Sequence, residues 1–435
     1  MLRTHGAVLT FLFLAGLARA DDWPAWRGPS GSGLSAEKKA PTTWAPDKNV
    51  KWKAALPQPG NGSPIVSNGR VFVAGPEDPE GKRRSLYCFD RKDGKLLWAK
   101  TVDFKGKVDP NEKYTHGTNT FSPSTPAADG KSVVVWHDSA GLFCYDFEGK
   151  ELWARDLGEF YHFWGHGGSP ILHDGKVILS CGPGTSVFVT ALDLKTGKTL
   201  WKTDEPQDLD EARVSKGFGD KNKGGKPAGS WSTPVLAKVG SEEQVIVSQP
   251  TRVVAYDPAD GKILWWVDGN RFDKGDLAYS SPILAGDLCV FFGGYNGPRF
   301  GFKMGGKDDM TASGRLWRQD EKGNPQSIGS GVFIDGYAYV PLAGPNVIDC
   351  VNPKTGEIVW RERWQGGAFW GSIVQAGGLC YVTDQAGKTA VFKPSPQKFE
   401  LVAANELREK SNSTPAISDG QIFLRTQKSL FCISE

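Results

Sequence analysis

The sequence predicts an all-β fold, an eight-bladed β-propeller of four-stranded antiparallel blades. The 435 residues include 54 Gly, 28 Pro and 16 Trp but only 3 Met, a composition typical of short strands joined by tight turns. An eleven-residue pattern that ends in Trp recurs along the chain, and a second hairpin signal precedes each copy. Units of four short strands that repeat every ~40–50 residues are the signature of propeller blades.

The Trp pattern predicts the outer hairpin of each blade. In its best copy, Ala191 to Trp201, a strand leads into a turn whose Asp193 bonds its own backbone and whose Gly197 supplies a positive φ. The final ring is expected to lie on the small residue and Gly of a hairpin, which is a structural role. The predicted structural tryptophans are Trp52, Trp98, Trp153, Trp201, Trp265, Trp317 and Trp360.

An inner hairpin precedes each Trp pattern and opens with Ser/Thr-Pro or a variant. The eight resulting units have their first strands near Ser63, Ser124, Ser169, Ser232, Ser280, Ser330, Gly371 and Ser413. The eighth unit lacks an outer strand, whereas residues 50–54 form an outer strand without a blade of their own. We therefore expect this N-terminal strand to complete the last blade and to remove the free edges of the array.

The N-terminus has the pattern of a secretory signal. Arg3 precedes an apolar run, and Ala18-Arg19-Ala20 is a small-x-small cleavage site. We predict a signal peptide over residues 1–20, an N-terminal extension over 21–47 and one propeller over 48–435. A retained anchor is the alternative, but the run is too short to span a bilayer comfortably. No Cys for lipidation lies near the site, so we expect a periplasmic or secreted protein with no transmembrane segment after cleavage.

Charge argues against nucleic-acid binding, and the cysteine positions argue against metal-binding or redox cysteines. The 52 Lys and Arg residues against 49 Asp and Glu provide no basic field, so nucleic-acid binding is not expected. The seven cysteines include no Cys-x-x-Cys or adjacent pair. Four of them occupy the small position of the Trp pattern, so they are interpreted as buried apolar residues: Cys88, Cys144, Cys350 and Cys432.

The candidate binding residues lie just before the first strand of each blade. The long connections fall between blades and between the two middle strands, and both kinds emerge on one face around the channel mouth. Residue identity varies there from blade to blade, which favours a ligand or partner surface, although loop drift is the alternative. We predict that the funnel is lined by Asn61, His116, Asn119, His162, Trp164, His166, Trp231, Tyr279, Trp370 and Asn412, with Phe121 and Phe369 beside them.

The Trp pattern resembles the tryptophan-docking motif of the quinoprotein-like eight-bladed propellers, and the resemblance covers nearly all of the mature chain. Residues 22–29 are similar to the leader of exported bacterial quinone-repeat-like propellers. The family contains pyrroloquinoline-quinone alcohol dehydrogenases and non-enzymatic relatives such as the periplasmic propeller of the outer-membrane β-barrel assembly machine. For an enzyme, the resemblance implies adjacent cysteines over the quinone, a Trp floor, and an Asn/Glu/Asp calcium site beside a catalytic Asp.

Two features of such enzymes are not found in this sequence. Adjacent cysteines and a Cys-x-x-Cys-His haem motif are both absent. His116, His162 and His166 offer metal-ligand chemistry, but Gly-rich loop surroundings favour structural roles. We predict a binding or scaffold module with no catalytic residue, cofactor or metal, which holds a protein, peptide or polysaccharide on its loop-rich face. The alternative is an oxidoreductase that uses pyrroloquinoline quinone with Ca²⁺, or another metal, in the same funnel.

Overall fold

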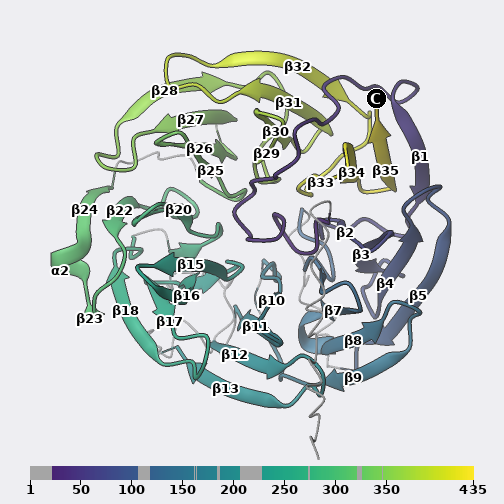
Figure 1. Cartoon of the computed structure of the whole chain (residues 1–435), viewed down its shortest axis with the longest axis horizontal. Helices are drawn as coiled ribbons and strands as arrows, with labels where there is room; N and C mark the ends of the chain where they lie inside the picture. Colours follow the sequence, from purple (N-terminus) through teal and green to yellow (C-terminus); the bar gives the residue numbers. More distant parts are fainter. Residues whose placement is uncertain are drawn as a thin grey trace, which may run out of the picture.

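Each blade starts with a short strand beside the central axis and ends with a longer strand at the rim (Figure 1). The computed structural model describes residues 22–105, 118–160, 162, 164–183, 187–205, 228–272, 275–320, 326–344 and 346–435. In these residues the strands form eight blades, each of four antiparallel strands, and the eighth blade takes its outer strand from the N-terminus. One blade gains a short fifth strand that pairs in parallel, and two other short strands form a separate parallel pair. The predicted fold class is therefore confirmed.

The first four blades follow one another along the chain. Blade 1 is β2 (Ile65–Ser67), β3 (Arg70–Pro76), β4 (Arg83–Asp90) and β5 (Leu96–Asp103); blade 2 is β6 (Ala127–Ala128), β7 (Ser132–Trp136), β8 (Leu142–Asp146) and β9 (Glu151–Arg155). Blade 3 is β10 (Ile171–His173), β11 (Lys176–Cys181), β12 (Phe188–Asp193) and β13 (Thr199–Asp204); blade 4 is β15 (Val235–Val239), β16 (Glu242–Ser248), β17 (Arg252–Tyr256) and β18 (Ile263–Asp268).

The remaining blades close the circle. Blade 5 is β20 (Ile283–Ala285), β21 (Leu288–Phe292), β22 (Arg299–Lys303) and β24 (Arg315–Gln319); blade 6 is β25 (Val332–Ile334), β26 (Tyr337–Leu342), β27 (Val347–Val351) and β28 (Ile358–Arg363). Blade 7 is β29 (Val374–Ala376), β30 (Leu379–Thr383), β31 (Lys388–Lys393) and β32 (Glu400–Glu406); blade 8 is β33 (Ala416–Ser418), β34 (Gln421–Arg425), β35 (Ser429–Ser434) and β1 (Val50–Ala55).

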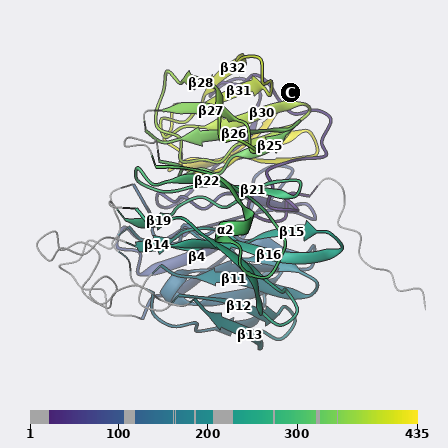
Figure 2. The same cartoon turned by 90° about the vertical axis from the view of Figure 1, so that its left-hand side faces the viewer.

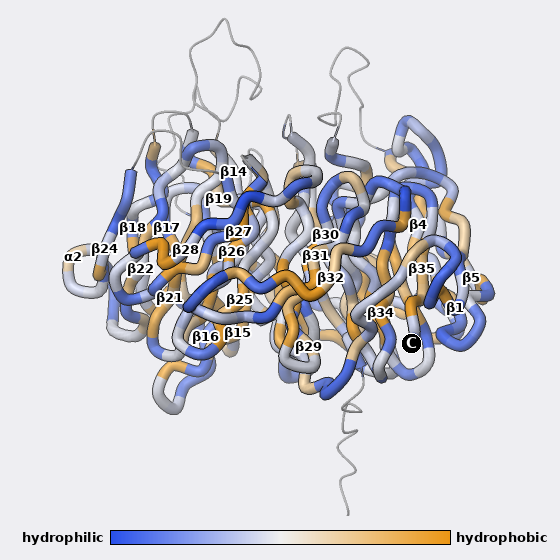
Figure 3. The backbone as a smooth tube through the Cα atoms, turned by 90° about the horizontal axis from the view of Figure 1, so that it is seen from above, coloured by the Kyte–Doolittle hydropathy of each residue, from blue (hydrophilic) through white to orange (hydrophobic). Residues whose placement is uncertain are grey.

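A few short elements lie outside the blade pattern. β14 (Ala228–Ser230) pairs in parallel with β19 (Asp276–Ala278) near one face of the disc, at the top in Figure 3. The 3-10 turn η1 (Asp138–Ala140) joins β7 to β8. β23 (Asp308–Asp309) and α2 (Thr311–Gly314) belong to the connection between β22 and β24, and Figures 1 and 2 place α2 at the outer surface beside blade 4.

The N-terminal strand closes the ring as predicted. β1 pairs antiparallel with β35, with Trp52 opposite Cys432, so it forms the outer strand of blade 8. The core consists of apolar clusters shared between neighbouring blades, such as the one that joins Phe72 of blade 1 to Tyr145 of blade 2. All seven cysteines are buried and unpaired, in agreement with their interpretation as small apolar residues.

The repeated tryptophans join each blade to the next. The indole N–H of Trp201, for example, donates to the Pro258 carbonyl in the outer turn of blade 4, and its ring lies on Gly261. Six of the seven predicted rings make such a bond to the following blade, at 2.8–3.1 Å: Trp52, Trp98, Trp153, Trp201, Trp317 and Trp360.

Trp265 departs from the predicted docking on a neighbouring hairpin. Its indole N–H donates to the side chain of Gln244 within the same blade, at 2.9 Å, and the ring is fully buried. The outer connection of blade 5 is too long to form the tight Gly turn that would receive it. This connection instead sends β23 back along β18, where Asp308 lies opposite Trp265 in a parallel pair.

The purple trace of the N-terminal extension crosses the centre of the ring in Figure 1, and Glu37 of the extension accepts hydrogen bonds from the inner hairpin turns of blades 7 and 8. Trp23 bridges to Val66 of blade 1, and Leu34 bridges to Gln375 of blade 7. Arg27 is buried and donates to the carbonyls of Ser32 and of Gly331 in blade 6. The Ala128 N–H of blade 2 also donates to the Pro24 carbonyl, so the extension contacts blades 2 and 6, which face each other across the axis.

The docking contact predicts a graded response to added methyl groups. Gly261 and Gly175 both have positive φ, but a Cβ at Gly261 would lie 2.3 Å from the Trp201 ring, whereas a Cβ at Gly175 would meet nothing within 4 Å. Gly175→Ala should cost only the left-handed backbone strain of ~1–2 kcal/mol. Gly261→Ala should cost a further ~1–3 kcal/mol through overpacking. Urea unfolding of the two variants measures the difference, and equal losses would contradict the docking role.

Candidate functional site

A closed ring of hydrogen bonds surrounds the channel axis. In each blade one Ser or Thr donates its backbone N–H to the side-chain hydroxyl of the equivalent residue in the next blade. The donors and acceptors are Ser63, Thr125, Ser169, Thr233, Ser281, Ser330, Ser372 and Thr414, with bonds of 2.9–3.1 Å. The eighth bond, from Thr414 to Ser63, returns to blade 1. We call these eight residues the hydroxyl ring.

The local sequence explains why the ring residues line up. Six of the eight precede Pro, which biases the preceding residue toward extended backbone. In an extended segment the residue two positions earlier points to the same side. These earlier residues are Asn61, Pro123, Gly167, Trp231, Tyr279, Ile328, Trp370 and Asn412, and all eight line one cavity. Each blade thus contributes one hydroxyl and one funnel side chain at a fixed spacing.

The cavity has a volume of about 310 Å³ and lies on the axis. Seven members of the hydroxyl ring line it, together with the eight residues two positions upstream. Trp26 of the N-terminal extension also lines it, and the buried Arg27 guanidinium lies 5.3 Å from the Trp26 ring centre. The extension therefore supplies a floor, and the side chains before the first strands supply the walls.

A chain of amide side chains forms one wall. Gln385 donates to Asn412 at 3.1 Å, Asn412 donates to Asn61 at 3.0 Å, and Asn61 donates to Asn119 at 3.4 Å. Asn119 in turn donates to the Trp164 carbonyl. This amide arc links the approaches to blades 8, 1, 2 and 3, so the orientation of each amide is fixed by its neighbours.

Three aromatic rings form the opposite wall. The ring centres of Trp164 and Trp231 are 6.1 Å apart, those of Trp164 and Tyr279 are 6.1 Å apart, and those of Trp231 and Tyr279 are 5.2 Å apart. The Trp231 indole donates to the Gly165 carbonyl at 2.8 Å. Burial raises the pKa of Tyr279, so its phenol remains a hydrogen-bond donor. This aromatic arc is rigid, because each ring is held by two others.

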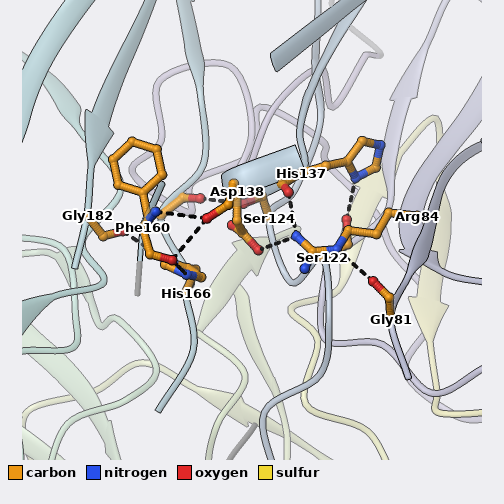
Figure 4. A network of polar contacts seen from close by, with 11 residues as sticks. Gly81, Arg84, Ser122, Ser124, His137, Asp138, Phe160, His166 and Gly182 are labelled. Carbon is orange, nitrogen blue, oxygen red and sulfur yellow. Dashed lines mark hydrogen bonds and ion pairs between the residues drawn. The ribbon is translucent and has the colours of Figure 1, made fainter. Parts of the chain in front are cut away.

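The three predicted histidines have different places. His162 lies behind the aromatic arc rather than in the cavity, with its ring centre 4.7 Å from that of Trp231, and burial lowers its pKa to about 3. His166 lines the cavity, and its ring nitrogens face the Gly182 and Phe160 carbonyls at 3.3 and 3.1 Å (Figure 4). His116 lies outside the described residues. The described part of the chain holds no group of three His, Cys, Asp or Glu side chains that could bind a metal.

The structure brings eight of the ten predicted funnel residues together around this cavity: Asn61, Asn119, Trp164, His166, Trp231, Tyr279, Trp370 and Asn412. His162 and Phe369 do not face the cavity, because both side chains are buried in the protein. The ring centre of Phe369 lies 6.0 Å from that of Trp364, in the apolar cluster shared by blades 6 and 7. Phe121 and the buried His162 both line a smaller pocket of about 40 Å³ beside the cavity.

Sequence reasoning missed several lining residues. The sequence places Trp26 in the N-terminal extension without predicting that it lines the funnel, and it gives no such prediction for Tyr295, Gln326 or Ile328 either. The position two residues before each Ser/Thr of the inner hairpin would have found Ile328, along with Pro123 and Gly167. No comparable signal exists for Trp26, because its place depends on how the extension crosses the axis.

A buried polar network supports the cavity wall between blades 1 and 3 (Figure 4). Arg84 donates to the His137 carbonyl at 2.5 Å and pairs with Asp138 at 3.5 Å. The His137 ring contacts the Ser122 hydroxyl. Burial, with a smaller contribution from Arg84, lowers the pKa of His137 to about 3. This imidazole is therefore neutral in the folded protein.

The described part of the cavity lining holds no carboxylate, ammonium or guanidinium group. Among these lining residues there is no Asp, Glu, Lys or Arg, and the one imidazole, that of His166, faces two backbone carbonyls. Four indoles, two phenols, four amides and a row of hydroxyls make up most of the surface. Such a surface binds neutral groups through ring contacts and hydrogen bonds rather than through ion pairs.

A sequence model of the family described as outer membrane protein assembly factor BamB matches residues 37–105, 82–340 and 344–433. The chain belongs to this family. The resemblance inferred from the Trp pattern is therefore confirmed. BamB of Burkholderia pseudomallei (strain K96243) is 23% identical over 392 residues, which cover 80% of this chain and 88% of that protein.

Relatives that are named as enzymes match a smaller share of their own length. Polyvinylalcohol dehydrogenase of Sphingopyxis sp. (strain 113P3) is 24% identical over 297 residues, which cover 63% of this chain but 41% of that enzyme. Among solved structures, quinohemoprotein alcohol dehydrogenase from Comamonas testosteroni has a TM-score of 0.65 at 15% identity, covering 96% of this chain and 81% of that one.

BamB from Moraxella catarrhalis has a TM-score of 0.57 at 14% identity, covering 88% of this chain and 96% of that one. These structural likenesses show a shared fold. No helix within the described residues has the length and apolar character needed to cross a membrane.

The hydroxyl ring predicts an isosteric effect on stability. Thr233→Val keeps the side-chain shape but removes the acceptor of the Ser169 N–H, which is buried. An unsatisfied buried donor costs ~1–3 kcal/mol. Thr233→Ser keeps the hydroxyl and should retain more stability than Thr233→Val in urea unfolding. A valine variant as stable as the wild type would show that the ring bonds contribute little.

The two buried histidines predict acid sensitivity. Their folded pKa values near 3 lie below the ordinary value of 6.5. Below pH 6.5 the unfolded chain therefore binds protons that the folded chain does not, and stability falls as the pH falls. Well below pH 6.5 each histidine contributes a slope that approaches ~1.4 kcal/mol per pH unit. His137→Asn should lower this slope by about one proton in denaturant titrations between pH ~4 and ~5.5, and an unchanged slope would contradict the buried neutral state.

Proposed function

We propose that the protein is a non-catalytic binding module that holds a partner in its central cavity and on the surrounding loop face. The observation that carries this proposal is the uncharged lining of the cavity, which combines aromatic rings with amides and hydroxyls. The amide and aromatic arcs are fixed before any ligand arrives, so binding costs little ordering of side chains. A protein, a peptide or a polysaccharide is the partner class that this arrangement supports.

The residues present do not fit pyrroloquinoline quinone with Ca²⁺. The quinone carries three carboxylates, and Ca²⁺ takes six to eight oxygen ligands that commonly include Asp or Glu. The described lining has no cationic Lys or Arg for the former and no carboxylate for the latter or for a catalytic base. The oxidoreductase alternative therefore lacks support in the geometry of the described residues.

The family membership fits a binding role. One relative that aligns over most of both chains is named an outer membrane protein assembly factor, which describes a role in assembly rather than a reaction. The predicted signal peptide over residues 1–20 adds that the module acts in the periplasm or after secretion. An aromatic-lined cavity with a polar rim is typical of a surface that recognises an external partner.

One experiment compares the binding and enzyme functions directly. Purified protein is mixed with pyrroloquinoline quinone and Ca²⁺, and melting temperature, quinone absorbance and dye-linked alcohol oxidation are measured. We expect no change in the first two and no dye reduction above a protein-free control. Dye reduction that requires both the quinone and Ca²⁺ would overturn the proposal.

A second experiment tests the chosen face. The triple variant Trp164→Ala, Trp231→Ala, Trp370→Ala should lose partners that the wild type retains in quantitative pull-downs. The matched control replaces Leu96, Leu152 and Leu200 by Ala; these apolar side chains are exposed on outer strands, away from the cavity. Retention of every partner by the cavity variant would contradict the assignment of this face.

A further inference from the structure

We propose, resting on the binding function above, that the cavity receives the uncharged end of a neutral saccharide chain. The sugar ring would pack against the aromatic side chains, and its hydroxyls would bond to polar groups that the protein leaves unpaired. This proposal commits to one chemical class among the three that the cavity supports.

The cavity combines aromatic faces with neutral polar groups. Sugar rings present C–H faces that pack on indole and phenol rings, and a rim of hydroxyls that both donate and accept hydrogen bonds. The aromatic arc supplies three rings on one side of the cavity, and Trp370 from blade 7 supplies a fourth. Aromatic side chains give large contact area at low entropic cost, because they have only two rotatable bonds.

Several polar side chains that line the cavity make no hydrogen bond to other described residues. Among the described residues, no hydrogen bond is made by the side chains of Trp26, Tyr279, Tyr295, Gln326 or Trp370, although all five line the cavity. They offer two indole N–H donors, two phenol hydroxyls and one amide. The asparagines of the amide arc, by contrast, are already bonded to one another. The unpaired groups are therefore the ones that remain for a ligand.

The cavity is poorly suited to a charged chain end. Because the N-terminal extension forms a floor, the cavity accepts a chain end rather than a chain that passes through. The end of a free peptide carries an ammonium or a carboxylate, and burying either without a partner is costly. The described lining holds no Asp, Glu, Lys or Arg that could pair with it, and both ring nitrogens of His166 already face backbone carbonyls. The end of a neutral saccharide carries no charge, so it avoids this cost.

The volume of the cavity suits one terminal sugar unit. At about 310 Å³ the cavity is near the lower limit of small-molecule sites, which span ~300–1,000 Å³. This space suits a terminal sugar unit, whereas a folded element of a protein partner does not fit. The rest of the saccharide chain would leave through the mouth and lie over the loop face.

Calorimetric titration with defined chains tests the proposal. The probes are hexasaccharides of β-1,4-glucose, β-1,4-xylose, β-1,3-glucose, β-1,4-mannose and α-1,4-glucose, with oligogalacturonate and a proline-rich decapeptide as comparisons. We expect at least one neutral hexasaccharide to bind and oligogalacturonate not to bind. The affinity should stay constant between ~0.05 and ~0.5 M NaCl, because no charge is paired.

Two cavity variants and one matched control locate the site. Trp370→Ala removes a ring, and Gln326→Ala removes an unpaired amide; each should weaken binding, the former by about tenfold or more. Trp266→Ala removes an indole of similar exposure on β18, outside the cavity, and should leave the affinity unchanged. Circular dichroism and melting temperature verify that all three variants fold.

The opposite results separate the two proposals. If no neutral hexasaccharide binds at up to ~1 mM, or if binding persists unchanged in both cavity variants, the saccharide proposal is overturned. If the decapeptide binds instead and is lost in Trp370→Ala, the ligand class is wrong while the binding module stands. If quinone and Ca²⁺ support dye-linked oxidation, the function proposed above fails as well.

Discussion

Around the channel axis, each blade donates one backbone N–H to a hydroxyl of the next, and the bond from Thr414 to Ser63 completes the circle. This closed set fixes every blade against two neighbours at its innermost point, where side-chain packing alone allows sliding. The residue two positions before each hydroxyl then faces the axis by strand alternation. The shape of the cavity therefore follows from the same contacts that close the fold.

The N-terminal segment contacts the ring of blades at two places, the rim and the axis. β1 closes blade 8 at the rim, and the extension before it crosses the axis and brings Trp26 into the cavity. The C-terminal residue strengthens the junction, because the Glu435 side chain accepts from the backbone N–H groups of Thr42 and Thr43 at 2.9 and 2.8 Å. Fold closure and the cavity floor thus depend on the same stretch of chain.

The sequence predicted the features that repeat and the positions that approach the axis, but not the places where irregular segments depart from the repeat. The Gly and Trp of the outer hairpins set the blade number because a tight turn and a ring need those residues. Trp265 has no tight Gly turn to pack on, because the outer connection of blade 5 carries an insertion. The local pattern around Trp265 does not reveal that insertion. His162 and Phe369 turned inward because loop backbones, unlike strands, impose no alternation. The function of the funnel residues was inferred from variation alone, whereas the uncharged lining became visible only once all blades were assembled.

The most direct test of this account is hydrogen exchange at the eight hydroxyl-ring amides, followed residue by residue by NMR in deuterated protein. The account predicts that all eight exchange at the slow rate of global unfolding, with Thr414 and Ser372 as protected as Thr233. Fast exchange at Thr414, with slow exchange elsewhere, would mean that the ring opens at the junction of blades 8 and 1. That result would contradict the claim that a closed ring holds the cavity in shape.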